Sequence, residues 1–118
     1  MLVVFLSLTP PEIRAQLAHL VYFTLHDPSP KKVADLVAAC HRYLAPIEGI
    51  VYFSVGTLNR ELNRPVNDLG YDVSLHVVFE SRQAHDKYQV DPSHLKFIGE
   101  QKQGWKLVRI FDSDVVNA

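Results

Sequence analysis

Four segments of this chain are rich in β-branched and aromatic residues, the composition that β-strands prefer. They are Leu17–His26, Ile50–Thr57, Tyr71–Glu80 and Trp105–Asp112. Apolar and polar positions do not alternate cleanly in them, as they would in a strand with one wet face. The pattern therefore predicts four strands whose two faces are both at least half buried.

An apolar stripe at helical spacing lies between the first two predicted strands. Its members follow the pattern i, i+3, i+4, i+7, i+11: Val33, Leu36, Val37, Cys40 and Leu44. Ser29 can cap this helix with Pro30 in its first turn, and Gly49 marks the exit.

Two shorter helical stretches, Ser81–Tyr88 and His94–Gln103, follow the third predicted strand. An Asp-Pro-Ser sequence separates them, and Ser93 is expected to cap the second. The resulting order is β-α-β-β-α-β, which predicts an α+β, ferredoxin-like fold. In this fold a four-stranded antiparallel sheet carries its helices on one face.

The first strand shows why one helical layer is not enough. One face carries Val21 and Phe23, and the other carries Leu20 and Tyr22. Helices cover only one of these faces, so a second copy of the sheet is expected on the other. We therefore predict a homodimer with two-fold symmetry. The alternative is a monomer with an amphipathic, partly aromatic exposed face.

The domain is expected to span residues 17–113. Residues 1–16 form an N-terminal extension that ends after a Pro-Pro pair, and residues 114–118 form a tail. A long polar stretch, Leu58–Gly70, connects the second and third strands. It could gate a pocket, contact a partner subunit or serve as a solvated connector.

Composition excludes several classes of protein. The 118 residues are 47% hydrophobic and 21% charged, with a net charge of −1. No basic stripe favours nucleic acid. The apolar start, Met1–Leu8, is too short to cross a membrane and lacks the features of a signal peptide. We expect a cytoplasmic protein with no membrane partner, whose one cysteine, Cys40, is a buried inert thiol.

The sequence indicates no metal site and no cofactor. It holds no pair of histidines four residues apart and no C-x-x-C. His26, His41 and His85 have no partner at ligand spacing. His76 falls on the strand face away from the helices, where a structural hydrogen bond is the expected role.

Several segments resemble the stress-responsive α/β-barrel domain family of the dimeric α+β barrel superfamily. They are HLVYFTLHD (His19–Asp27), YDVSLHVVFES (Tyr71–Ser81), YQVDPSH (Tyr88–His94) and WKLVRIFD (Trp105–Asp112), in the family's order and spacing. The resemblance implies two sheets that close face to face in a dimer.

One plant member of this family is a polyketide cyclase, which closes a poly-β-keto thioester by aldol condensation. Residue by residue, its catalytic tyrosine and histidine match Tyr88 and His94, and a pocket histidine matches His19. A further pocket histidine falls at Val73, so this chain departs from the cyclase pattern there.

The residues themselves give a reason for the same site. His94 follows Ser93 in a first helical turn, where the helix dipole disfavours the imidazolium form, and a neutral imidazole can act as a general base. The Tyr88 hydroxyl could hold an enolate, and His19 lies on the helix side of its strand. A cavity there would be lined by Val21, Phe23, Val73, Leu75, Phe97 and Ile110. All three polar side chains could equally have structural roles.

Three functional hypotheses remain open. The first is a dimeric barrel that binds a small apolar or aromatic ligand in a stress-response-like role. The second is a cyclase-like lyase with His94 as base and Tyr88 as hydrogen-bond donor. The third is a cofactor-independent oxygenase of the same superfamily.

Overall fold

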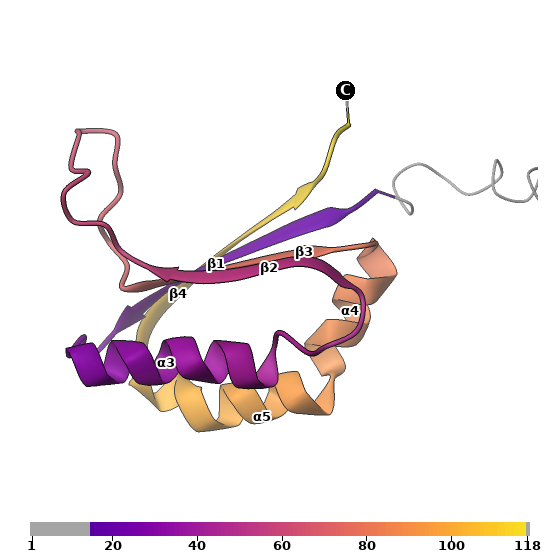
Figure 1. Cartoon of the computed structure of the whole chain (residues 1–118), viewed down its shortest axis with the longest axis horizontal. Helices are drawn as coiled ribbons and strands as arrows, with labels where there is room; N and C mark the ends of the chain where they lie inside the picture. Colours follow the sequence, from indigo (N-terminus) through magenta and orange to yellow (C-terminus); the bar gives the residue numbers. More distant parts are fainter. Residues whose placement is uncertain (1–14, 118) are drawn as a thin grey trace, which may run out of the picture.

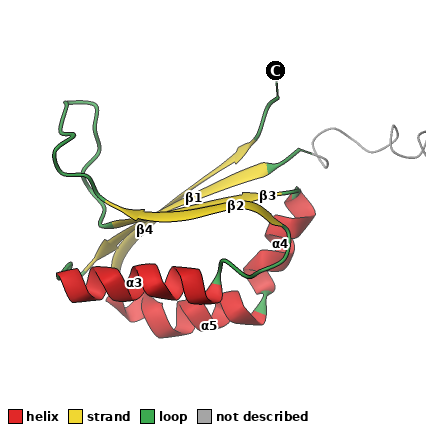
Figure 2. Ribbon diagram, in the orientation of Figure 1, coloured by secondary structure: helices red, strands yellow, loops and turns green. Residues whose placement is uncertain are grey.

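The computed structural model describes residues 15–117 and has helices packed on one face of a single sheet (Figures 1 and 2). The elements are β1 (Leu17–Leu25), α3 (Pro30–Tyr43), β2 (Ile50–Thr57), β3 (Val73–Phe79), α4 (Arg82–Val90), α5 (Pro92–Gln101), the 3-10 turn η1 (Lys102–Gly104) and β4 (Trp105–Asp114). The predicted ferredoxin-like α+β fold is confirmed. Of the predicted extension, only Ala15 and Gln16 lie within the described residues.

The sheet has the order β2-β3-β1-β4, and all three neighbouring pairs are antiparallel. In the register Val21 lies opposite Leu75 on β3 and opposite Ile110 on β4. Side chains of opposed residues point to the same face of the sheet. These positions therefore face α3 and α5, as the sequence predicted for Val21.

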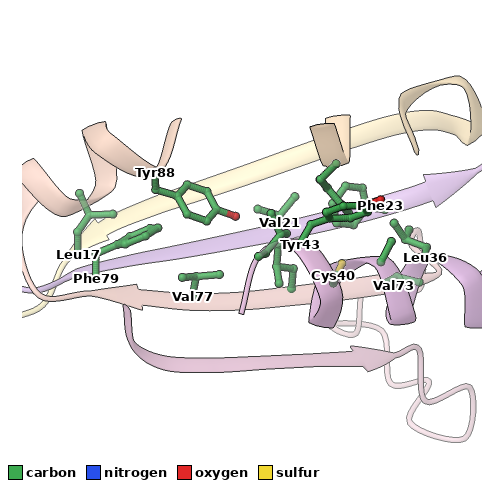
Figure 3. Packing of buried hydrophobic residues seen from close by; sticks show 14 of the residues in the cluster. Leu17, Val21, Phe23, Leu36, Cys40, Tyr43, Val73, Val77, Phe79 and Tyr88 are labelled. Carbon is green, nitrogen blue, oxygen red and sulfur yellow. The ribbon is translucent and has the colours of Figure 1, made fainter. Parts of the chain in front are cut away.

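The hydrophobic core fills the space between the sheet and the helices (Figure 3). Phe23, Val77 and Phe79 project from the strands, and Leu36 and Cys40 meet them from α3. Burial raises the pKa of the Cys40 thiol to about 12, so the thiol stays protonated. The prediction of a buried cysteine is confirmed.

Helix α5 begins earlier than the sequence predicted. Asp91, rather than Ser93, is its N-cap, because the Asp91 carboxylate accepts a hydrogen bond from the Ser93 backbone N–H at 2.8 Å. Pro92 then occupies the first helical position, which suits its missing N–H. The Ser93 hydroxyl instead donates to the Tyr43 carbonyl at 2.6 Å and ties α5 to the end of α3.

Strand β4 extends two residues beyond its predicted end at Asp112. Ser113 and Asp114 stay in register with Ala18 and Leu17 of β1. The Val115 N–H then donates to the Gln16 carbonyl at 2.8 Å. Backbone pairing with β1, which a polar C-terminal sequence does not reveal, therefore sets the end of this strand.

The other face of the sheet carries no helix of the described chain (Figure 1). It presents Tyr52, Leu107 and Phe111, whose residues are 57%, 50% and 51% exposed. Phe111 also meets Tyr22 of β1, with ring centroids 5.8 Å apart. We call this surface the open face. Its apolar character matches the two-face pattern that the sequence showed.

The long connection between β2 and β3 rises on the side of the open face, away from α3 and α5 (Figure 1). Asp68 in this connection accepts a hydrogen bond from the Arg109 guanidinium of β4 at 2.8 Å. That ion pair holds the pKa of the exposed Asp68 carboxyl below its usual range. The connection therefore lies on the side of the sheet opposite the helices and their core.

Gly49 allows the chain to turn from α3 into β2 against α4. Its φ of +90° disfavours any side chain, and a Cβ atom there would lie 2.6 Å from the Cβ of Ala84. We expect Gly49→Ala to lower the free energy of unfolding by about 2 kcal/mol or more. Urea denaturation followed by circular dichroism measures this change.

Gly99→Ala is the matched control for that substitution. Gly99 lies in α5 with nothing within 4 Å of its added Cβ, so alanine should stabilise by about 0.5–1 kcal/mol. Equal effects of the two substitutions would contradict the close contact at Gly49.

Candidate functional site

A cavity of about 120 Å³ lies between the sheet and the helices. Most of its wall is apolar, and four polar side chains from β1, α4 and α5 interrupt it. The lining residues are His19, Val21, Phe23, Leu44, Leu75, Tyr88, Gln89, His94, Phe97, Ile98, Trp105, Val108 and Ile110.

The structure brings His19, Tyr88 and His94 to this one cavity, together with most of the apolar residues predicted to line it. Val73 is the exception. It is fully buried in the core and does not line the cavity. Ile110 lines the cavity but remains 53% exposed, because β4 is an edge strand of the sheet.

His94 is held as a neutral imidazole with a defined tautomer. Its Nδ1 lies 3.2 Å from the Gln89 carbonyl oxygen, which can only accept, so Nδ1–H donates and Nε2 keeps a lone pair. Burial lowers the pKa of His94 below 6.5, against the opposing effect of the Gln89 carbonyl, and the nearby His19 lowers it further. The position of His94 in the first turn of α5 acts in the same direction.

Tyr88 lies beside His94, with ring centroids 4.4 Å apart. Figure 3 shows its ring next to Phe79 and its hydroxyl directed along the core toward Val21. Burial is the main cause that raises the pKa of Tyr88 above 10. The phenol therefore stays protonated at neutral pH and is available as a hydrogen-bond donor.

His19 is paired with a carboxylate that the sequence analysis did not single out. Its Nδ1 lies 2.5 Å from Asp112 Oδ1, and the two residues face each other in the β1–β4 register. The carboxylate accepts, so Nδ1–H donates and His19 keeps its lone pair on Nε2. Asp112 could have been found by pairing the first and last predicted strands.

Trp105 is the second functional residue that the sequence analysis missed. It lines the cavity and packs on Phe23 at a centroid distance of 5.0 Å. Its buried indole N–H, however, has no hydrogen-bond partner among the residues that the structure describes. Buried donors are nearly always paired, so this N–H needs explanation.

His85 was predicted to have no partner at ligand spacing, but the structure places it beside His19. Its ring lies 5.4 Å from that of His19, on the side where Asp112 stands. The sequence spacing could not show this, because His85 reaches the pair from α4. His76 instead contacts the Ser54 hydroxyl at 2.9 Å on the open face, as expected for a structural histidine. His26 and His41 are exposed and lie outside the cavity.

The fold and the enclosed polar cluster define a small α+β domain with its own cavity on the helix side. A family model described as the stress responsive A/B barrel domain matches residues 17–115. The chain therefore belongs to this family. No curated protein matches the chain. Among its described residues, the chain has no helix with the length and apolar character needed to cross a membrane.

Solved structures share the fold at low sequence identity. A protein of this family from Mesorhizobium loti has 19% identity and a TM-score of 0.73, covering 87% of this chain and 99% of its own. A dimeric ferredoxin-like protein of unknown function from Thermobifida fusca has 15% identity and a TM-score of 0.70, with coverages of 86% and 92%. A hydroxynitrile lyase from Passiflora edulis has 14% identity and a TM-score of 0.73, with coverages of 89% and 97%.

The neutral state of His94 makes stability depend on pH. Below pH 6.5 the unfolded chain binds more protons at this residue than the folded chain does. Stability should therefore fall as pH decreases from 6.5, until the pH passes the lower folded pKa. His94→Gln cannot titrate, so its stability should fall less steeply over this range. Urea unfolding at a series of pH values measures how steeply stability depends on pH in the unmodified protein and in His94→Gln.

An NMR titration that places the pKa of His94 at or above 6.5 would contradict the predicted lowering of this pKa by burial.

Proposed function

We propose that the chain forms a homodimeric barrel and that each subunit binds a small apolar or aromatic ligand in the cavity beside His94 and Tyr88. The cavity walls support this proposal, because they are mainly apolar and carry a few converging polar groups. Such a combination is typical of small-molecule sites. We therefore propose the chemical class of the ligand, which is small and apolar or aromatic. A stress-response role is an expectation that comes from the family alone.

The single observation that carries the proposal is the unpaired indole N–H of Trp105. A buried donor without a partner costs about 1–3 kcal/mol, and a ligand oxygen can remove that cost. Trp105 lines the same cavity as His94, whose Nε2 is an acceptor. A ligand with an apolar ring and one hydroxyl group, which can accept from the indole N–H and donate to Nε2, would satisfy these groups together.

The volume of the cavity limits the size of this ligand. A cavity of about 150 Å³ is known to accept benzene, and the space here is about 120 Å³. A single aromatic ring is therefore near the upper limit for the side-chain positions observed. A long poly-β-keto chain would need the walls to move, which favours a smaller ligand than a cyclase substrate.

The open face supports the homodimer. Three large apolar residues are each at least half exposed on this face: Tyr52, Leu107 and Phe111. The ring of Phe111 also packs against that of Tyr22. Several large apolar side chains exposed on one face of a sheet favour an interaction surface. The Thermobifida fusca protein, which is described as dimeric, shares the fold. A second sheet packed on this face would leave the cavity of each subunit on the outer, helix side.

Acid–base catalysis in the same cavity is the second candidate function. Its support is the neutral His94, whose Nε2 could take a proton from a hydroxyl or from a carbon next to a carbonyl. The protonated Tyr88 could donate to the oxygen on which charge develops. A lyase reaction fits this pair, and the Passiflora edulis enzyme shows that the fold can host one.

Ligand binding can be tested by blocking the cavity from α5. We expect benzaldehyde or phenol to shift the NMR signals of cavity residues in the unmodified protein. Ile98→Phe puts a larger side chain into the cavity wall and should weaken binding by about tenfold or more. Leu95→Phe, on the exposed side of the same helix, should leave binding unchanged.

Equal binding by the two variants would contradict a ligand site in this cavity. The same compounds separate the alternatives. His94→Gln should still bind ligand, and it should lose any cleavage or condensation activity only if His94 acts as a base. Oxygen uptake with an electron-rich phenol would instead favour the oxygenase hypothesis.

The dimer can be tested by placing a charge on the open face. We expect the unmodified chain to sediment at twice its 13.4 kDa mass at micromolar concentration. Phe111→Lys should weaken association by about thirtyfold or more, because it removes an aromatic contact and buries a charge. Leu95→Lys, on α5, is the control and should remain dimeric. A 13.4 kDa species alone in the unmodified protein would overturn the proposal.

A further inference from the structure

Three potential metal ligands meet at one end of the sheet, from three different elements. His19 comes from β1, Asp112 from β4 and His85 from α4. One ligand atom from each side chain lies within 4.8 Å of those from the other two. The positions are far apart in the sequence, so the folded chain alone creates the group.

We propose that His19, His85 and Asp112 bind one divalent transition-metal ion, such as zinc. Two imidazoles and one carboxylate suit zinc, cobalt or iron rather than magnesium, which prefers oxygen ligands. Three protein ligands also leave coordination positions open for water or for a bound molecule. The proposal goes beyond the ligand site described above, which does not require a metal.

The hydrogen bonds of His85 prepare it as a ligand. Its Nδ1 lies 2.9 Å from Asp86 Oδ1, so Nδ1–H donates and the lone pair is on Nε2. The Arg82 guanidinium holds the same carboxylate oxygen at 3.0 Å. Metal-binding histidines usually donate their second ring N–H to a carboxylate in this way. The side-chain amide of Gln89 lies 3.3 Å from His85 Nε2 and can donate to the same lone pair, so this amide would have to move away when an ion binds.

The distances require only local adjustment. Metal–ligand bonds of about 2.0–2.2 Å place neighbouring ligand atoms about 3–3.5 Å apart. His19 Nδ1 and Asp112 Oδ1 are 2.5 Å apart. A metal ion at Nδ1 would replace the proton that this nitrogen donates to Asp112, and the imidazole would carry its proton on Nε2 instead. The two ligand atoms must then separate slightly, and His85 must approach. The His19 side chain is nearly inaccessible, whereas the Asp112 side chain is 44% exposed and lies on an edge strand.

A surface hollow of about 350 Å³ gives an ion access to the group. His85 and Asp112 line this hollow, and Asp114 adds a second carboxylate beside them. Arg82 is the cation among the lining residues, and its charge is paired with Asp86. His19 lines the inner cavity instead. The ion would therefore stand in the wall that separates the solvent from the proposed ligand site.

Co²⁺ and Zn²⁺ are suitable probes for the full-length, tag-free protein. We expect one Co²⁺ per chain, with visible absorption bands that Zn²⁺ abolishes by competition, and no competition by Mg²⁺. His85→Ala should weaken Co²⁺ binding by about tenfold or more and remove the bands. His85 does not line the inner cavity, so benzaldehyde binding should remain. His41→Ala, at an exposed histidine outside the group, should behave as the unmodified protein.

Equal Co²⁺ affinity in the unmodified protein and in His85→Ala would overturn the proposal, as would no binding to the unmodified protein. Circular dichroism checks that His85→Ala is folded without metal. If this variant is unfolded, His85→Gln is used in its place. NMR on the unmodified protein gives a second measurement that does not depend on a variant. Paramagnetic Co²⁺ should broaden the ring signals of His19 and His85 first, and broadening centred on His26 or His41 would also overturn the proposal.

Discussion

The pairing of β1 with both β3 and β4 is the constraint on which the rest of the structure depends. Because β1 is an interior strand, its register fixes which side chains of three strands share a face. It sets Val21 and His19 toward the helices and Leu20 and Tyr22 toward the open face. A shift of one residue would exchange these sets, and it would also separate His19 from Asp112.

Each of the two buried histidines in this small core has a hydrogen-bond acceptor on a neighbouring element. Asp112 reaches His19 from an edge strand, and the Gln89 carbonyl reaches His94 from the end of α4. In both cases the partner leaves one imidazole nitrogen without a proton. Burial therefore costs less than it would for an unpaired imidazole, and the histidines keep a lone pair for chemistry or binding.

Local patterns in the sequence predicted most of the fold. The stripe from Val33 to Leu44 and the aromatic strands gave the element order, and two apolar strand faces indicated a covered sheet. The predicted cap of α5 was wrong because Asp91 and Ser93 can both cap a helix, and the choice depends on where Tyr43 offers its carbonyl. Local sequence carries no information about that distant acceptor.

The candidate site was predictable only in part, for a similar reason. His94 and Tyr88 are near in sequence and follow the family pattern, so they could be placed together. Asp112, His85 and Trp105 join them through strand register and through the packing of α4 and β4. Val73 shows the opposite case, in which a residue that matched a pocket position lies in the core and outside the cavity.

Gly49 has a consequence for the site as well as for the turn that it forms. Its missing side chain lets the backbone before β2 pass directly against Ala84 of α4. The carbonyl oxygen of Gly49 also accepts a hydrogen bond, at 2.9 Å, from the backbone N–H of Glu80, which lies just before α4 begins. The distance of α4 from the sheet is thus limited by a residue that has no functional group. Because Gly49 has no side chain, α4 can pack close to the sheet, and this packing positions Tyr88 and His85 relative to His19.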